Sequence, residues 1–202
     1  MLIVLGIIGI VAALTMPTLI AKHKEKETVT KLKKVYSVLD NAYMLARNEH
    51  TDVTNWFENN FTNINSKIFF DNIKPYLNIA KDCGFEPGCL TSGAVKTLDR
   101  RSYANYDDNL SEYRFALADG TQVIIMLNSS TCTAANGCGN IKVDIDGLRG
   151  QMDTVYPFID YCNISKTTAA NGRSCVAWVI QNENMDYLHC NDLSWNGKTK
   201  CK

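Results

Sequence analysis

The feature that most constrains this chain is an uncharged, apolar run at its N-terminus, residues 1–21 (MLIVLGIIGIVAALTMPTLIA). As an α-helix with a rise of about 1.5 Å per residue, the run would extend roughly 31 Å, close to the ~30 Å hydrocarbon core of a bilayer. A helix of a water-soluble domain has one apolar stripe and one polar face, and this run has no polar face. The sequence therefore predicts a transmembrane helix over residues 1–21.

Two other interpretations of this run stay open. A cleaved secretory signal peptide would carry a basic region before the apolar run and a small-residue cleavage site after it, and neither is evident. A buried core helix would need a larger soluble partner around it. The spacing of Gly9 and Ala13 would let another helix approach closely, which favours helix packing. Pro17 lacks an N–H group and is expected to kink or loosen the helix.

After Ala21 the pattern becomes charged and amphipathic, which predicts that the helix continues over residues 22–50 and ends within 48–54. Lysines dominate this segment and are interpreted as a solvated face, with contacts to lipid headgroups or neighbouring subunits as the alternative. Apolar residues recur at steps of three and four: Val29, Leu32, Tyr36, Leu39, Tyr43 and Ala46.

Eight cysteines, all after residue 80, favour disulfides in an oxidising compartment, and hence a domain outside the cytoplasm. Lysines directly after the apolar run would instead favour a cytoplasmic C-terminal side. This conflict disappears if a more basic segment precedes Met1. Eight cysteines allow 105 pairings. Pairing of neighbours is favoured: Cys83 with Cys89, Cys132 with Cys138, Cys162 with Cys175, and Cys190 with Cys201.

The strongest strand pattern surrounds Asp119-Gly120, a dipeptide typical of hairpin turns, and predicts strands over 113–117 and 122–127. Further strands are expected over 141–145 and 176–180, and a short helix over 68–77. The aromatic residues of the head are expected in its core: Trp56, Phe57, Phe61, Phe69 and Phe70.

The predicted fold class is therefore α+β, with a long N-terminal helix packed on an antiparallel β-sheet head that has disulfide-closed loops. Residues 51–202 would form this head. Equal numbers of basic and acidic residues, 21 of each, do not suggest a nucleic acid partner. The three histidines, His23, His50 and His189, are scattered and no nucleophile motif is present, so we expect no enzymatic activity.

An acidic segment at the end of the third predicted strand contains Asp144 and Asp146, with Asp153 nearby. Carboxylate oxygens are the ligands that Ca²⁺ prefers, so these residues are a candidate calcium site. The simpler interpretation is a polar strand end and turn, because the full twelve-residue calcium loop is absent. No other cofactor is expected.

The apolar run with its glycines, Ala12-Ala13 and Pro17, followed by the charged amphipathic extension, resembles the N-terminal helix of type IV pilins and of the pseudopilins of type II secretion. In that family a prepilin peptidase removes a short basic leader and the new N-terminus, Phe-Thr-Leu-x-Glu, is methylated. By this resemblance we expect the sequence either to be truncated just after that Glu or to start at an internal Met. Asp144, Asp146, Gly147, Arg149 and Gly150 match a segment of many prepilin heads. The pair Cys190 and Cys201 resembles the disulfide that bounds the C-terminal loop of many type IV pilins.

The resemblance implies a structural subunit held in the bacterial cytoplasmic membrane with its head outside, and later part of a cell-surface filament. Its partners would be the membrane, copies of itself or other pilins, the prepilin peptidase and the assembly platform. A membrane-tethered binding domain that does not polymerise is the alternative function. The residues implied in membrane storage and assembly are Leu2, Ile3, Leu5, Gly6, Ile7, Ile8, Gly9, Ala13, Leu14 and Pro17.

Overall fold

The structure of the protein is a computed structural model. The side chains of residues 2–12 and 152–155 lie outside the description. The described residues are 2–51, 55–57, 63–90, 112–127, 139–145, 152–155 and 175–202.

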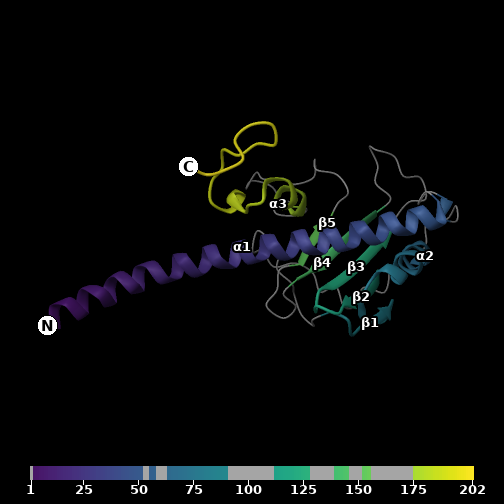
Figure 1. Ribbon diagram of the computed structural model, residues 1–202, viewed down its shortest axis with the longest axis horizontal. Coiled ribbons are helices and arrows are strands. Elements are labelled where there is room, and N and C mark those ends of the chain that lie inside the picture. The colour runs from purple at the N-terminus through teal and green to yellow at the C-terminus, as the bar shows by residue number, and fades with distance from the viewer. Residues whose placement is uncertain are drawn as a thin grey trace.

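Helix α1 (Leu2–His50) dominates the molecule with 49 residues. It continues through Pro17, and the hydroxyl of the next residue, Thr18, donates a hydrogen bond to the Thr15 carbonyl oxygen (2.8 Å). The amphipathic pattern places Val29, Leu32 and further residues of its C-terminal half in the core, because one side of the helix faces the head. The N-terminal half projects beyond the head (Figure 1). The prediction of one helix of some fifty residues is confirmed.

Five strands form an antiparallel sheet in the order β1-β2-β3-β4-β5. Each strand pairs with the one that precedes it in the sequence, which is the meander that short turns favour. The predicted hairpin is confirmed, with Gly120 in the turn at a positive φ of 88°. The strands are β1 (Ile79–Gly84), β2 (Tyr113–Leu117), β3 (Gln122–Leu127), β4 (Gly139–Asp144) and β5 (Met152–Val155).

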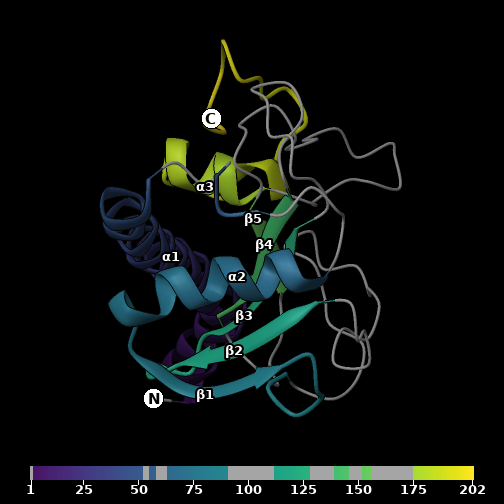
Figure 2. The ribbon, with the colours of Figure 1, turned by 90° about the vertical axis from the view of Figure 1, so that its right-hand side faces the viewer.

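Helices α1 and α2 (Asn63–Ile73) cover one face of this sheet (Figures 1 and 2). The 3₁₀ helix η2 (Lys74–Tyr76) follows α2 and leads into β1. Alternation along β2 and β3 directs Phe115, Val123 and Ile125 toward the helices, where they are buried. Four of the five aromatic residues expected in the core are buried, and the fifth, Phe61, lies outside the described residues: Trp56, Phe57, Phe69 and Phe70.

The predicted strand over 176–180 is wrong, because these residues belong to helix α3 (Val176–Asn182). A short apolar run fits a strand and a buried helix equally well, and tertiary packing decides between them. Val176 and Val179, three residues apart, are buried on one side of α3, and Trp178 is buried as well; α3 lies against α1 and also contacts β5. Glu183 ends the helix in the left-handed conformation (φ 57°), and the 3₁₀ helix η5 (Asp186–Leu188) follows.

Candidate functional site

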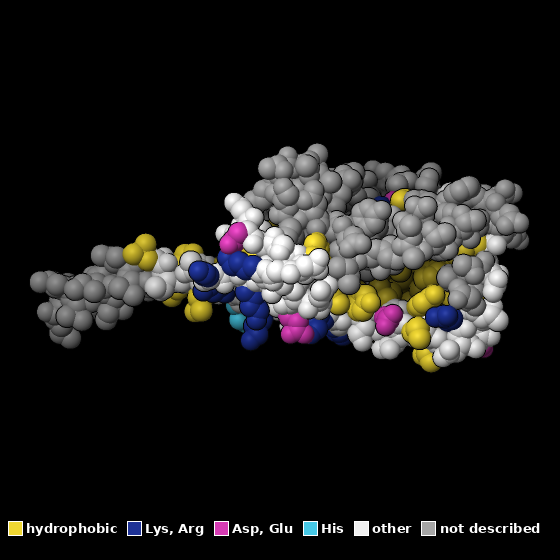
Figure 3. Space-filling model, turned by 90° about the horizontal axis from the view of Figure 1, so that it is seen from above, with side chains coloured by type: hydrophobic (Ala, Val, Ile, Leu, Met, Phe, Trp, Pro, Cys, Tyr) yellow, Lys and Arg dark blue, Asp and Glu magenta, His cyan; other side chains and the backbone are white. Residues whose placement is uncertain are grey.

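The most unusual surface of the molecule is the projecting part of α1. Every residue from Ala13 to Lys24 is exposed, although the sequence of this part is apolar as far as Ala21. Leu14 is 73% exposed and Leu19 is 70% exposed. Large apolar side chains rarely stand free in this way on a folded domain, and their clustering marks an interaction site. Figure 3 shows hydrophobic side chains on the projecting helix beside a group of lysines where the helix reaches the head.

The apolar residues of this part surround the helix instead of forming one stripe. Successive residues of an α-helix are about 100° apart, so the exposed residues Leu14, Leu19 and Ile20 point in three different directions. A helix that is apolar on all sides is suited to the core of an assembly or to a lipid environment. We call the exposed residues 13–21 the projecting segment.

The predicted assembly residues fall partly within this surface. Ala13, Leu14 and Pro17 belong to the projecting segment and are exposed. The backbone of the other seven is helical, but their side chains lie outside the description: Leu2, Ile3, Leu5, Gly6, Ile7, Ile8 and Gly9.

Among the described residues, no helix combines enough length and hydropathy to cross a bilayer. Within the predicted transmembrane segment, 1–21, Met1 and the side chains of residues 2–12 lie outside the description.

The head is fastened to α1 just beyond the projecting segment. Nε2 of His189 lies 2.9 Å from Oε2 of Glu25, and Lys33 forms an ion pair with Glu183 at the end of α3. Lys34 pairs with Asp119 in the turn between β2 and β3 (2.8 Å). These contacts attach the C-terminal region and the hairpin to the same stretch of helix. The sequence pattern predicted a solvated face for these lysines, with lipid headgroups or neighbouring subunits as alternative partners, and gave no sign of their acidic partners in the head, which are 85 to 150 residues away.

Two of these carboxylates have lowered pKa values. The hydrogen bond from Lys33, and then its charge, lowers the pKa of Glu183. Burial raises the pKa of Asp119, but hydrogen bonds from Lys34 and Thr121 outweigh it, so the net pKa lies below the ordinary value. Both groups are therefore charged at neutral pH, and both ion pairs are present there.

Among the described residues, disulfide bonds close two of the four predicted loops. Cys83 is bonded to Cys89, and Cys190 to Cys201. Cys175 is also disulfide-bonded. The remaining predicted disulfide residues lie outside the described part of the chain: Cys132, Cys138 and Cys162.

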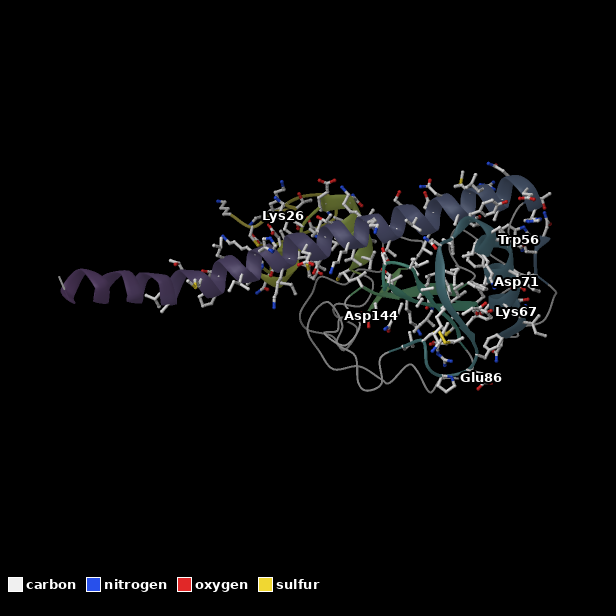
Figure 4. All side chains as sticks on the ribbon, turned by 60° about the horizontal axis from the view of Figure 1, so that its bottom comes forward. Lys26, Trp56, Lys67, Asp71, Glu86 and Asp144 are labelled. Carbon is white, nitrogen blue, oxygen red and sulfur yellow. A yellow bond between two sulfur atoms is a disulfide. The ribbon has the colours of Figure 1, made fainter. Side chains whose placement is uncertain are left out.

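Of the three candidate calcium ligands, Asp144 alone has a side chain among the described residues. Asp144 is fully buried in β4, while Asp146 lies outside the description. Asp153 is in register with Val143 and not with Asp144, and its side chain is not described. Within the described ranges, no three acidic, histidine or cysteine side chains are arranged to hold a metal ion. Figure 4 shows Asp144 inside the head, away from Lys26 on the helix.

One face of the sheet carries a buried layer of charged residues that the sequence pattern did not predict. Arg114 is fully buried, and its Nη1 donates hydrogen bonds to the carbonyl oxygens of Phe85 (2.8 Å) and Glu86 (3.3 Å) in the disulfide loop. Glu112 and Lys142 form a buried ion pair on the same face. Alternating polar residues in strands predict a solvated face, so the sequence pattern carried no signal for this burial. Through the hydrogen bonds of Arg114, this layer holds the Cys83–Cys89 loop against the sheet.

Comparison with known proteins identifies one family. A family model described as "Family of unknown function (DUF6613)" matches residues 18–144, which begin inside the projecting segment and extend through β4. No curated protein and no solved structure matches the chain.

Proposed function

The chain belongs to the family of unknown function DUF6613, and we propose that it is a pilin-like structural subunit whose N-terminal helix packs against the same helix of other subunits in a filament. Before assembly, the membrane would hold this helix. The filament would be a type IV pilus or a secretion pseudopilus, and the head would remain outside the cytoplasm.

One observation carries this proposal: a single continuous helix has two different environments along its length. From Val29 to Ala46 its apolar side is buried in the head, whereas the projecting segment exposes Leu14, Leu19 and Ile20 to solvent. Fully burying a side chain of this size stabilises a structure by about 1.5–3 kcal/mol. Packing several such residues against neighbouring helices therefore supplies a substantial driving force for assembly.

The attachment of the head supports the same role. Because α1 contributes Leu32, Val35 and Leu39 to the head core, the head cannot separate from the helix without losing its own core. The ion pairs of Lys33 with Glu183 and of Lys34 with Asp119 add further attachments. A filament built through the helix would thus display one folded head for each subunit.

The proposal can be tested by Leu19→Asp in cells that produce the full chain together with its own assembly machinery. A buried carboxylate would oppose packing of the helices, so we expect the variant to be missing from sheared surface fibres probed with an antibody to the head. Ile64→Asp is the matched control, because Ile64 is also an exposed apolar residue but lies on α2. Thermal melting should show that both variants keep a folded head.

Normal incorporation of Leu19→Asp into fibres would overturn the proposal. Absence of any fibre that contains the wild-type chain, with the chain retained at the cell membrane, would instead favour the membrane-tethered binding domain.

A further inference from the structure

We propose that Lys22, Lys24 and Lys26, at the base of the projecting segment, form a collar that binds the headgroups of anionic phospholipids while the apolar end of α1 lies in the bilayer. This inference rests on the proposed function, because it requires a membrane to store the helix before assembly. We call these three residues the lysine collar.

The charges around the collar are unevenly paired. Residues 22–34 contain six lysines and two glutamates. Lys31 pairs with Glu27 (3.0 Å), while Lys33 and Lys34 pair with acids of the head. Among the described residues, the three collar lysines form no ion pair, and all three are exposed. The positive charge that remains therefore lies at the end of this stretch nearest the apolar segment.

The collar lies on opposite sides of the helix. With about 100° between successive residues, Lys22 and Lys26 are roughly 40° apart, whereas Lys24 lies roughly 160° from each of them. A single neighbouring helix would contact only one of these sides. A layer of headgroups surrounds a helix that passes through it and would contact all three lysines.

The length of the collar also suits a headgroup layer. From Lys22 to Lys26 the helix rises roughly 6 Å, and each headgroup layer of a bilayer is about 5–8 Å thick. The apolar residues Leu14, Leu19 and Ile20 lie on the side away from the head, where the hydrocarbon would begin. Lysine side chains can direct their ammonium groups toward phosphate while their methylene stems lie against the apolar region.

The acidic surface of a second copy is the competing partner, and the structure favours it less. Most of the described carboxylates are already in ion pairs within the chain, so few of these described groups remain to attract the collar of a neighbour. The paired acidic residues are Glu25, Glu27, Asp71, Asp82, Glu112, Asp119, Glu183 and Asp192.

The test is flotation of the purified full chain with two kinds of vesicle, one of phosphatidylcholine and one of phosphatidylcholine mixed with phosphatidylglycerol. Each lysine near an anionic surface contributes about fivefold to binding, so the wild type should prefer the anionic vesicles by roughly a hundredfold. The variant Lys22→Gln/Lys24→Gln/Lys26→Gln should bind both vesicles equally. Added salt should weaken the wild-type preference, because these charges are exposed.

The control Lys67→Gln/Lys200→Gln/Lys202→Gln removes the same charge from exposed lysines of the head and should retain the preference. Matching melting temperatures would show that all three proteins are folded. Binding to vesicles of phosphatidylcholine alone measures insertion of the apolar helix. If the wild type bound neither kind of vesicle, membrane storage of the helix would be overturned and, with it, this inference.

Equal binding of the wild type to both vesicles, or an unchanged preference in the collar variant, would overturn the lysine collar and leave the proposed function standing. If the collar variant kept the preference for anionic vesicles but lost chemical cross-linking between copies, the lipid-binding role of the lysine collar would also be overturned. The collar would then be assigned to the acidic surface of a second copy.

Discussion

Nζ of Lys34 on α1 lies 2.8 Å from Oδ2 of Asp119 in the turn between β2 and β3, so an ion pair joins the long helix to the hairpin across 85 residues of sequence. Asp119 also accepts a hydrogen bond from the backbone N–H of Thr121 (3.1 Å), which shapes the turn itself. One carboxylate therefore contributes to a local turn and to the attachment of α1.

This carboxylate gives the fold an acid-sensitive contact. Its pKa is lower in the folded protein than in the unfolded chain, so its contribution to stability is present above the unfolded value, about 4, and is lost as the pH falls through the folded value. We expect Asp119→Asn to lower the urea midpoint at pH 7 and to match the wild type in strong acid. Asp40→Asn is the control, because Asp40 is an exposed residue of α1 that forms no ion pair among the described residues. An equal loss for Asp119→Asn at both pH values would contradict the prediction.

Shortening a leucine side chain of α1 to alanine should lower the stability of the fold only on the side of the helix that faces the head. Leu32 is 1% exposed and Leu45 is 50% exposed. Leu32→Ala should lower the free energy of unfolding by about 2–5 kcal/mol, because it removes buried apolar area and leaves a cavity. Leu45→Ala should change it by less than about 0.5 kcal/mol. Chemical denaturation of the two variants checks this difference, and similar losses would show that α1 does not pack on the head as described.

The disulfide Cys190–Cys201 should contribute more stability than Cys83–Cys89. The bonded residues are 11 positions apart in the first and 6 in the second. In the loop-entropy model, closing the longer loop stabilises the fold by about 3 kcal/mol and closing the shorter one by about 2 kcal/mol. Cys190→Ser/Cys201→Ser and Cys83→Ser/Cys89→Ser should follow this order in chemical denaturation. The reverse order would show that local contacts, such as those of Arg114, outweigh chain entropy.

Two glycines should resist substitution for different reasons. Gly120 has a φ of 88° and open space around it, so Gly120→Ala should cost only the backbone term, about 1 kcal/mol. A Cβ on Gly139 would lie 2.1 Å from the Met126 carbonyl oxygen of the adjacent strand. Gly139→Ala must therefore shift the backbone and should cost about 2 kcal/mol or more. Thermal melting distinguishes the two, and a milder effect at Gly139 would be inconsistent with this strand contact.

Local patterns in the sequence were sufficient for the elements whose determinants are close together along the chain. The spacing of Val29, Leu32 and Leu39 predicts the amphipathic half of α1, and Asp119-Gly120 predicts the β2–β3 hairpin. Helical periodicity and turn chemistry act over a few residues, so they can be recognised without knowledge of the fold. The neighbour pairing of Cys83 with Cys89 and Cys190 with Cys201 is of the same kind.

Tertiary structure alone decided the features that depend on distant partners. Residues 176–180 form a helix because α3 packs against α1, and no local sequence pattern indicates this contact. Arg114 is buried although its strand position suggests a solvated face, since its guanidinium reaches the carbonyl oxygens of Phe85 and Glu86.

The candidate site shows the same division. Its apolar composition from Ala13 to Ala21 was evident from the sequence, because hydropathy belongs to each residue separately. The exposure of Leu14 and Leu19, and the difference between the paired Lys33 and the unpaired lysine collar, were decided by where the head ends along α1. That boundary depends on contacts between residues up to 164 positions apart, such as Glu25 and His189, and only the folded chain brings these together.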